Sequence, residues 1–146
     1  MAVGGLVAVS AAAPAPAQAT VSQTYLSSYE GGVVRAINAQ RARYGLRALW
    51  YTACPDGYAE RWASHLRTYS TFYHQNIYNV MTGCHSTMAA ENLARASLST
   101  SPTSLVALWM ASSAHRANIL NPRLRQVGMG TECYYTTCTT VADFIY

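Results

Sequence analysis

Two histidines and one glutamate are the residues of this chain best suited to bind a metal ion. His74 follows the aromatic pair Phe72-Tyr73, Glu91 lies in a nearly uncharged stretch, and His115 lies in the first turn of a short predicted helix. The positive end of a helix dipole lowers the pKa of an imidazole and favours the neutral form that binds metals. Two neutral imidazoles and one carboxylate suit Zn²⁺ or another divalent ion, with a fourth position open to water. Alone, each of these residues is more simply structural, so the set of three carries the hypothesis.

The sequence blocks around these residues resemble a known family. The blocks are Asn38-x-x-Arg41-x-x-x-Gly45-Leu46, Tyr73-His74, Ala90-Glu91-Asn92-Leu93-Ala94, Ser112 to Pro122, Val127-Gly128-Met129-Gly130 and Val141-Ala142-Asp143-Phe144. In this order, over residues 28–146, they resemble the bacterial secreted branch of the CAP superfamily, which is named for cysteine-rich secretory proteins, antigen 5 and pathogenesis-related class 1 proteins. The block from His115 to Pro122, H-R-x-N-I-L-N-P, is the most specific of them.

The resemblance implies a fold and a site. The fold is α+β, an α-β-α sandwich with a three-stranded antiparallel sheet between helical layers. The site is a cleft in which His74, Glu91 and His115 converge. Four neighbours are expected to support the cleft: Asn92, Ser112, Arg116 and Asn118. We expect Arg116 to pair with an acid or with backbone carbonyls, and Asn118 to hydrogen-bond a neighbouring loop.

One acidic residue of the family pattern is missing. Many eukaryotic members have W-x-x-E, whereas this chain has Trp109-Met110-Ala111-Ser112. Without the second carboxylate, a hydrolytic mechanism would need another group or a bound hydroxide. We therefore expect a secreted protein whose cleft binds a divalent metal and a small ligand or cell-wall component, without strong catalysis.

Two alternative functions stay open. The first is a metal-dependent extracellular hydrolase acting on peptide or envelope substrates, with Glu91 as ligand or base. The second is a lipid- or sterol-binding module, which would need an exposed apolar groove; no amphipathic stripe of the sequence is left over for one. The 11 tyrosines are explained more economically by the core and its rim than by sugar stacking.

The composition describes one basic domain. The 146 residues are 51% hydrophobic and 11% charged, which is not the composition of a disordered chain. Ten arginines, no lysine and six acids give a net charge of +4. The arginines are scattered singly, which argues against nucleic-acid binding. After the apolar start, no run approaches the roughly 20 residues of a membrane-spanning helix, so we do not expect a transmembrane protein.

The first residues predict export. Residues 1–19 have the small apolar run and the Ala17-Gln18-Ala19 cleavage signature of a signal peptide, although no basic residue precedes the run. A disordered Ala/Pro leader is the alternative. Residues 20–27 would then be a short linker and residues 28–146 the CAP domain.

The four cysteines predict disulfides. Cys133 and Cys138 flank a predicted hairpin and would lie close together, which pairs Cys54 with Cys84. The second pair would close a loop of about 30 residues and stabilise the fold by roughly 3 to 4 kcal/mol. Four cysteines allow three pairings, and sequence alone does not choose among them. A zinc site is the competing interpretation, which the scattered spacing disfavours.

The elements that must position these residues follow from capping and periodicity. We expect one helix that begins at a Ser27-x-x-Glu30 capping box and a second from about Pro55-Asp56. A third helix would be capped by Thr100 or Ser101, with Pro102 in its first turn, and a short fourth helix from Ala114 to Leu120 would be capped by Ser113. Strands are expected over 127–131 and 139–145, joined by a loop over 134–137.

Overall fold

The computed structural model describes residues 23–146, with side chains from residue 26 onward. In this range the elements are α1 (Gln23–Arg43), β1 (Trp50–Tyr51), α2 (Ala53–Thr68), α3 (Ile77–Gly83), β2 (Ala89–Ser97), α4 (Pro102–Ala111), α5 (Ser113–Ile119), β3 (Gln126–Tyr134) and β4 (Thr137–Ile145). The predicted signal peptide, residues 1–19, lies outside the described residues. Among the helices of this range, none combines the length and the apolar character needed to cross a membrane.

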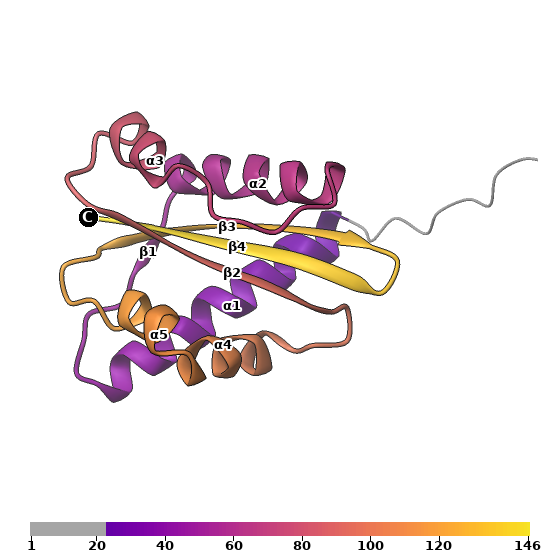
Figure 1. Ribbon diagram of the computed structural model, residues 1–146. Helices are drawn as coiled ribbons and strands as arrows, with labels where there is room; N and C mark the ends of the chain where they lie inside the picture. The colour runs from indigo at the N-terminus through magenta and orange to yellow at the C-terminus, as the bar shows by residue number, and fades with distance from the viewer. Residues whose placement is uncertain (1–22) are drawn as a thin grey trace, which may run out of the picture.

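The elements form three layers. Helices α2 and α3 cover one face of the sheet, and α1, α4 and α5 cover the other (Figure 1). The expected α-β-α arrangement is therefore present, but the expected three-stranded antiparallel sheet is wrong in detail. The sheet has four strands in the order β1-β3-β4-β2, and β1 runs parallel to β3. With only two residues, Trp50 and Tyr51, β1 is too short to produce an alternating pattern.

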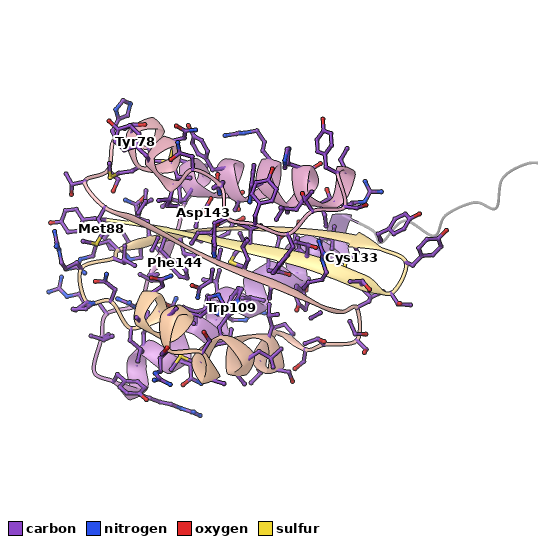
Figure 2. The ribbon with its side chains drawn as sticks, in the orientation of Figure 1. Tyr78, Met88, Trp109, Cys133, Asp143 and Phe144 are labelled. Atoms are coloured by element: carbon purple, nitrogen blue, oxygen red, sulfur yellow. A yellow bond between two sulfur atoms is a disulfide. The ribbon has the colours of Figure 1, made fainter. Side chains whose placement is uncertain are left out.

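Each face of the sheet buries its own core. Val141 of β4 and Leu93 of β2 pack with Ala63 and Leu66 of α2. The next residue of β4, Ala142, points to the opposite face, as alternation along a strand requires. That larger core contains Val33, Val34, Ile37, Leu49, Leu105, Val106, Trp109, Ile119, Leu124, Val127, Met129, Ala142 and Phe144. Figure 2 labels Trp109 and Phe144 of this core.

Two glycines allow α2 to lie directly on β3. A Cβ atom at Gly128 would be 1.9 Å from the backbone nitrogen of Asp56, and one at Gly130 would be 2.3 Å from the carbonyl carbon of Ala59. No side chain fits in that space, so the close backbone approach expected from the sequence is confirmed.

The predicted helix ends are partly correct. Ser101 caps α4 by accepting a hydrogen bond from the Ser104 backbone N–H at 3.1 Å, and Pro102 is in its first turn. The capping box predicted at Ser27 is wrong, because α1 begins at Gln23 and both box residues are inside the helix. Residues 23–27, expected in a linker, are thus helical. Helix α5 is capped at Ser112, one residue earlier than predicted.

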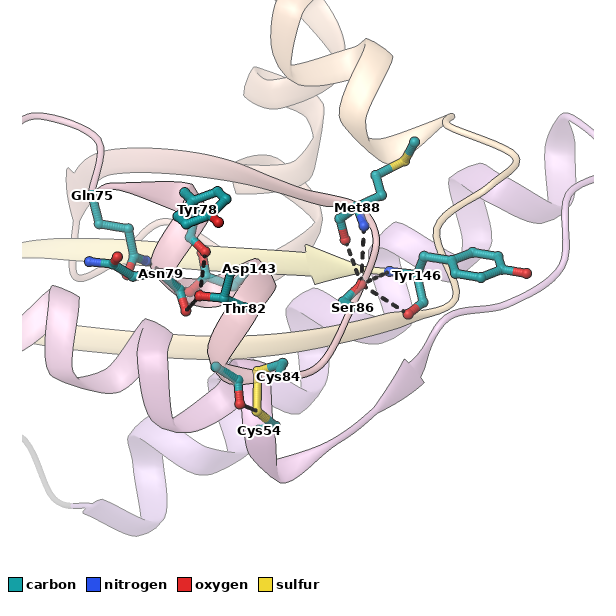
Figure 3. Close-up of a disulfide and its surroundings, with 11 residues drawn as sticks. Cys54, Gln75, Tyr78, Asn79, Thr82, Cys84, Ser86, Met88, Asp143 and Tyr146 are labelled. Atoms are coloured by element: carbon teal, nitrogen blue, oxygen red, sulfur yellow. Dashed lines mark hydrogen bonds between the residues drawn. A yellow bond between two sulfur atoms is a disulfide. The ribbon is translucent and has the colours of Figure 1, made fainter.

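Both proposed disulfides are present. Cys54 is bonded to Cys84 and Cys133 to Cys138, with Cα–Cα distances of 5.7 and 4.0 Å. The first bond connects the start of α2 with the end of α3 (Figure 3). All four cysteines are therefore occupied, which excludes the competing zinc interpretation at these residues.

Candidate functional site

His74 lies in the loop between α2 and α3, and its neighbours hold that loop in place. The Trp62 indole donates a hydrogen bond to the carbonyl of Tyr73 at 3.0 Å. The Tyr73 hydroxyl is 2.8 Å from Nε2 of His65. Asn76 ends the loop by capping α3 through its side chain. Bonds on both sides of His74 therefore fix the backbone that presents it.

Glu91 orients the His74 imidazole. Nδ1 of His74 is 2.6 Å from Oε1 of Glu91, whose side chain is only 3% exposed, whereas that of His74 is 58% exposed. Gln75 donates to the same carboxylate twice, from its backbone N–H to Oε1 at 3.3 Å and from Nε2 to Oε2 at 2.7 Å. Both carboxylate oxygens of Glu91 thus accept hydrogen bonds, and the exposed edge of the imidazole carries Nε2.

A second carboxyl group, Asp143, lies beside Glu91. The two residues are directly opposite each other in the antiparallel pairing of β2 with β4. The Nε2 amide of Gln75 donates to both, reaching Oδ2 of Asp143 at 2.8 Å (Figure 3 labels Gln75 and Asp143). Burial is the main reason that the pKa of Asp143 is raised to about 8, and the charge of Glu91 is the second. Burial also raises the pKa of Glu91, against the lowering effect of its hydrogen bonds to Gln75 and His74.

His115 approaches the site from α5. The Asn92 side chain of β2 donates to the His115 carbonyl at 3.1 Å, and Asn118 donates to the Glu91 carbonyl at 3.1 Å and to Asn92 Oδ1 at 2.9 Å. Because β2 is an edge strand, groups from the two faces of the sheet can meet around it. Burial lowers the pKa of the His115 imidazole, and the charge of His74 lowers it further. The direction agrees with the prediction, although these causes differ from the helix dipole invoked for it.

The remaining predicted residues have structural contacts. Arg116 donates to the Met110 carbonyl at 3.0 Å, and Ser112 joins α4 to α5 without a side-chain capping bond. The expected bond of Arg116 to a backbone carbonyl is therefore observed, whereas Asn118 bonds to strand β2 and not to a neighbouring loop.

The site differs from the expected set of three ligands. Among residues 26–146, no three His, Cys, Asp or Glu side chains are grouped so that they could hold a metal ion together. His74 and Glu91 bond to each other, while His115 is near enough to His74 to feel its charge. Sequence reasoning did not assign roles to Gln75 and Asp143. The sheet register reveals Asp143, and the hydrogen bonds to Glu91 and Asp143 reveal Gln75.

The sequence of this domain matches a known protein family. The model of the cysteine-rich secretory protein family, the CAP domain, matches residues 34–144. The chain belongs to this family. The CAP domain of this chain is also similar to YkwD of Bacillus subtilis (strain 168), with 32% identity over 129 residues, covering 81% of this chain and 49% of YkwD. The chain thus spans about half the length of that relative.

Solved structures share the CAP fold with this chain. An extracellular protein containing an SCP domain from Bacillus anthracis is 21% identical with a TM-score of 0.65, over 86% of this chain and 44% of that one. An outer surface protein of Borrelia burgdorferi is 16% identical with a TM-score of 0.73, over 88% and 97% of the two chains. At these identities the likeness concerns the fold.

Proposed function

We propose that this chain is an extracellular CAP domain that binds a divalent metal ion through His74 and His115 and offers the remaining coordination positions to a ligand. The observation that carries the proposal is the bond between His74 Nδ1 and buried Glu91. A carboxylate on one imidazole nitrogen fixes the tautomer and leaves the other nitrogen with its lone pair free for a metal. Glu91 therefore acts as a partner of the ligand His74 rather than as a ligand.

His115 supplies the second imidazole. Its lowered pKa keeps this imidazole neutral at physiological pH, which is the protonation state that binds metal. Imidazole nitrogens suit Zn²⁺, Cu²⁺ and Ni²⁺ more than Ca²⁺ or Mg²⁺. With two protein ligands, the site would hold its metal weakly and leave positions for water or an extracellular ligand.

Binding is favoured over hydrolysis by the state of Glu91. A general base must have a lone pair directed at the proton it removes. Both Glu91 oxygens accept bonds from His74 and Gln75, and the side chain is only 3% exposed, so its remaining lone pair is shielded from an attacking water molecule. Its neighbour Asp143 is fully buried and has a pKa of about 8, so it holds its proton at neutral pH. The two disulfides and the extracellular relatives support secretion.

Titration calorimetry with Zn²⁺ on the disulfide-bonded protein tests the metal site. We expect binding that is lost in His74→Ala and in His115→Ala. Glu91→Gln should weaken binding about 10- to 100-fold, as is usual for a residue that orients a metal ligand. His85→Asn is the matched control, because His85 is an exposed histidine outside the site and asparagine tolerates its positive φ of 52°. Zn²⁺ binding that is unchanged in both histidine variants, or absent in the wild type, would refute the proposal.

A further inference from the structure

A cavity of about 640 Å³ lies away from the His74 site, at the other end of the sheet. Its walls come from the end of α2, from Arg95 of β2 and from the β3–β4 hairpin. Here α2 no longer covers its face of the sheet, so the threonines of β4, including Thr139, form the floor. A volume of this size accommodates a ligand of several rings.

Most of the lining residues are polar, and together they carry a net positive charge. Arg67, Arg95 and Glu132 are its ionisable groups apart from tyrosine, and Leu66 is its single aliphatic side chain. Such a lining does not suit an acyl chain or a sterol, which need a continuous apolar wall. Nε of Arg67 lies 3.9 Å from Oε2 of Glu132, so two guanidinium groups against one carboxylate leave a net positive charge that favours an anionic ligand.

Arg95 is held in position by the protein. Its Nη2 donates to the Thr71 carbonyl at 2.6 Å, its Nε donates to Thr139 Oγ1 at 3.3 Å, and its guanidinium lies 4.9 Å from the centre of the Phe72 ring. Within the described part of the chain, the third nitrogen, Nη1, has no bonded partner. An arginine fixed in this way loses little side-chain entropy when it binds a carboxylate.

Tyr134 provides an aromatic surface beside the arginines. Its side chain is 49% exposed, and the neighbouring Tyr135 ring meets it edge-on with centroids 4.4 Å apart. The Cys133–Cys138 disulfide closes the hairpin that carries both rings. A rigid tyrosine can stack on the apolar face of a sugar ring while its hydroxyl stays in water.

Backbone strain marks the same cavity. Three non-glycine residues in the described range have positive φ, and two of them, Ser70 and Tyr135, line it with φ of 53°. Such strain is typical of functional sites, because it must be compensated by the surrounding structure.

From these observations we propose that this cavity, which we call the hairpin groove, binds an acidic oligosaccharide, a sugar chain whose rings carry carboxylates. Tyr134 stacks on a ring, Arg95 and Arg67 pair with carboxylates, and the threonine hydroxyls of the floor bond to sugar hydroxyls. The groove is separate from the proposed metal site. Arg95 is four residues from Glu91 on the same face of β2, which corresponds to about 13 Å.

The test uses a tetramer of galacturonic acid and its neutral methyl ester as probes. Amide chemical shifts of the whole disulfide-bonded protein, followed during titration, give both the affinity and the location. We expect the acid tetramer to shift amides of β4 and of the hairpin, with an affinity that falls as salt increases. The methyl ester should bind at least fivefold more weakly.

Variants decide whether the groove is responsible. Tyr134→Ala and Arg67→Gln should each weaken binding of the acid tetramer at least fivefold. Arg95→Gln should have the same effect, and its thermal midpoint is measured as well because Arg95 also bonds to Thr71 and Thr139. Tyr44→Ala and Arg123→Gln are matched controls, since both residues are exposed and lie outside the groove. His74→Ala should leave saccharide binding unchanged, which separates this proposal from the metal site.

Three results would overturn the proposal. The first is no shift with the acid tetramer at millimolar concentration. The second is equal binding of the methyl ester, which would contradict the role of the arginines. The third is equal loss in Tyr134→Ala and Tyr44→Ala, which would show that the tetramer binds elsewhere or without specificity.

Discussion

Arg41 is a buried cation whose removal should strongly destabilise the fold. Its side chain is fully buried, and it donates to the carbonyls of Arg47 (2.8 Å), Ile119 (2.8 Å) and Asn121 (2.9 Å), with a longer contact of 3.4 Å to Leu124. These carbonyls belong to the loop after α1 and to the end of α5 and the segment that follows it. One guanidinium therefore ties α1 to the chain that leads from His115 into β3.

The magnitude for Arg41→Met follows from these bonds. Methionine has a similar length but no donor, so three well-formed bonds are lost and their carbonyls are left in the interior. Each orphaned group costs about 1 to 3 kcal/mol. Removing a buried charge offsets part of that cost, because burial and the nearby Arg125 already lower the pKa of Arg41. The expected net loss is about 3 to 5 kcal/mol. Arg41→Lys should lose less, since an ammonium group can still donate to some of these carbonyls.

Urea unfolding at pH 7 without reductant measures the loss for both variants. Arg123→Met is the control, because Arg123 is exposed and its backbone N–H, rather than its guanidinium, makes the bond to Asn121 Oδ1. This control should change the free energy of unfolding by less than about 0.5 kcal/mol. A loss below about 1 kcal/mol for Arg41→Met would refute the view that the carbonyls depend on this side chain.

Three further predictions concern packing, crosslinks and pH. Gly130→Ala should lower the free energy of unfolding in urea by at least about 2 kcal/mol, because the added Cβ meets the Ala59 backbone. Gly31→Ala, whose nearest neighbour is at 3.4 Å, should be neutral or stabilising, and equal effects of the two variants would contradict the packing argument. Replacing Cys54 and Cys84 by alanine should lower the free energy of unfolding by about 3.6 kcal/mol, and replacing Cys133 and Cys138 by about 2 kcal/mol, because the closed loops differ in length (30 and 5 residues). If the denaturant midpoints fall in the reverse order, chain entropy is not the cause. Burial raises the pKa of Glu30 from 4.5 to about 7, so between these pH values the Glu30 carboxyl is ionised in the unfolded chain but protonated in the folded one. The free energy of unfolding should therefore fall by about 3 kcal/mol as pH rises from 4.5 to 7. Glu30→Gln should flatten this fall when unfolding is measured across that range, and an unchanged slope would show that Glu30 is not its source.

The fold could be predicted from sequence where local signals are strong. Ser101-Pro102 marks the start of α4, and alternation of apolar residues with glycine marks β3. Strand β2 gave no such signal, because its sequence A-A-E-N-L-A-R-A-S contains no β-branched residue. It is a strand because Leu93 completes a core and because its backbone pairs with β4 along nine positions. Tertiary contacts decide its structure.

The candidate site, like the fold, could be predicted from sequence only in part. His74, Glu91 and His115 can be identified by residue type and by the resemblance of the blocks around them. Gln75 and Asp143 could not, since their role depends on the register that places Asp143 opposite Glu91. A one-residue shift of that register would turn Asp143 to the other face, so no argument from single residues could assign it.

The alternation of β2 explains how one strand serves the metal site, both cores and the hairpin groove. Glu91, Leu93 and Arg95 point to the α2 face, where they hold His74, fill the core and line the groove. Asn92 points to the opposite face and bonds to the α5 backbone at His115. Because Leu93 is 5% exposed between them, the side chains of Glu91 and Arg95 are separated by packed core. Substitutions in the groove should therefore leave the His74–Glu91 bond intact, whereas Asn92→Ala should displace His115 and weaken Zn²⁺ binding without affecting the saccharide.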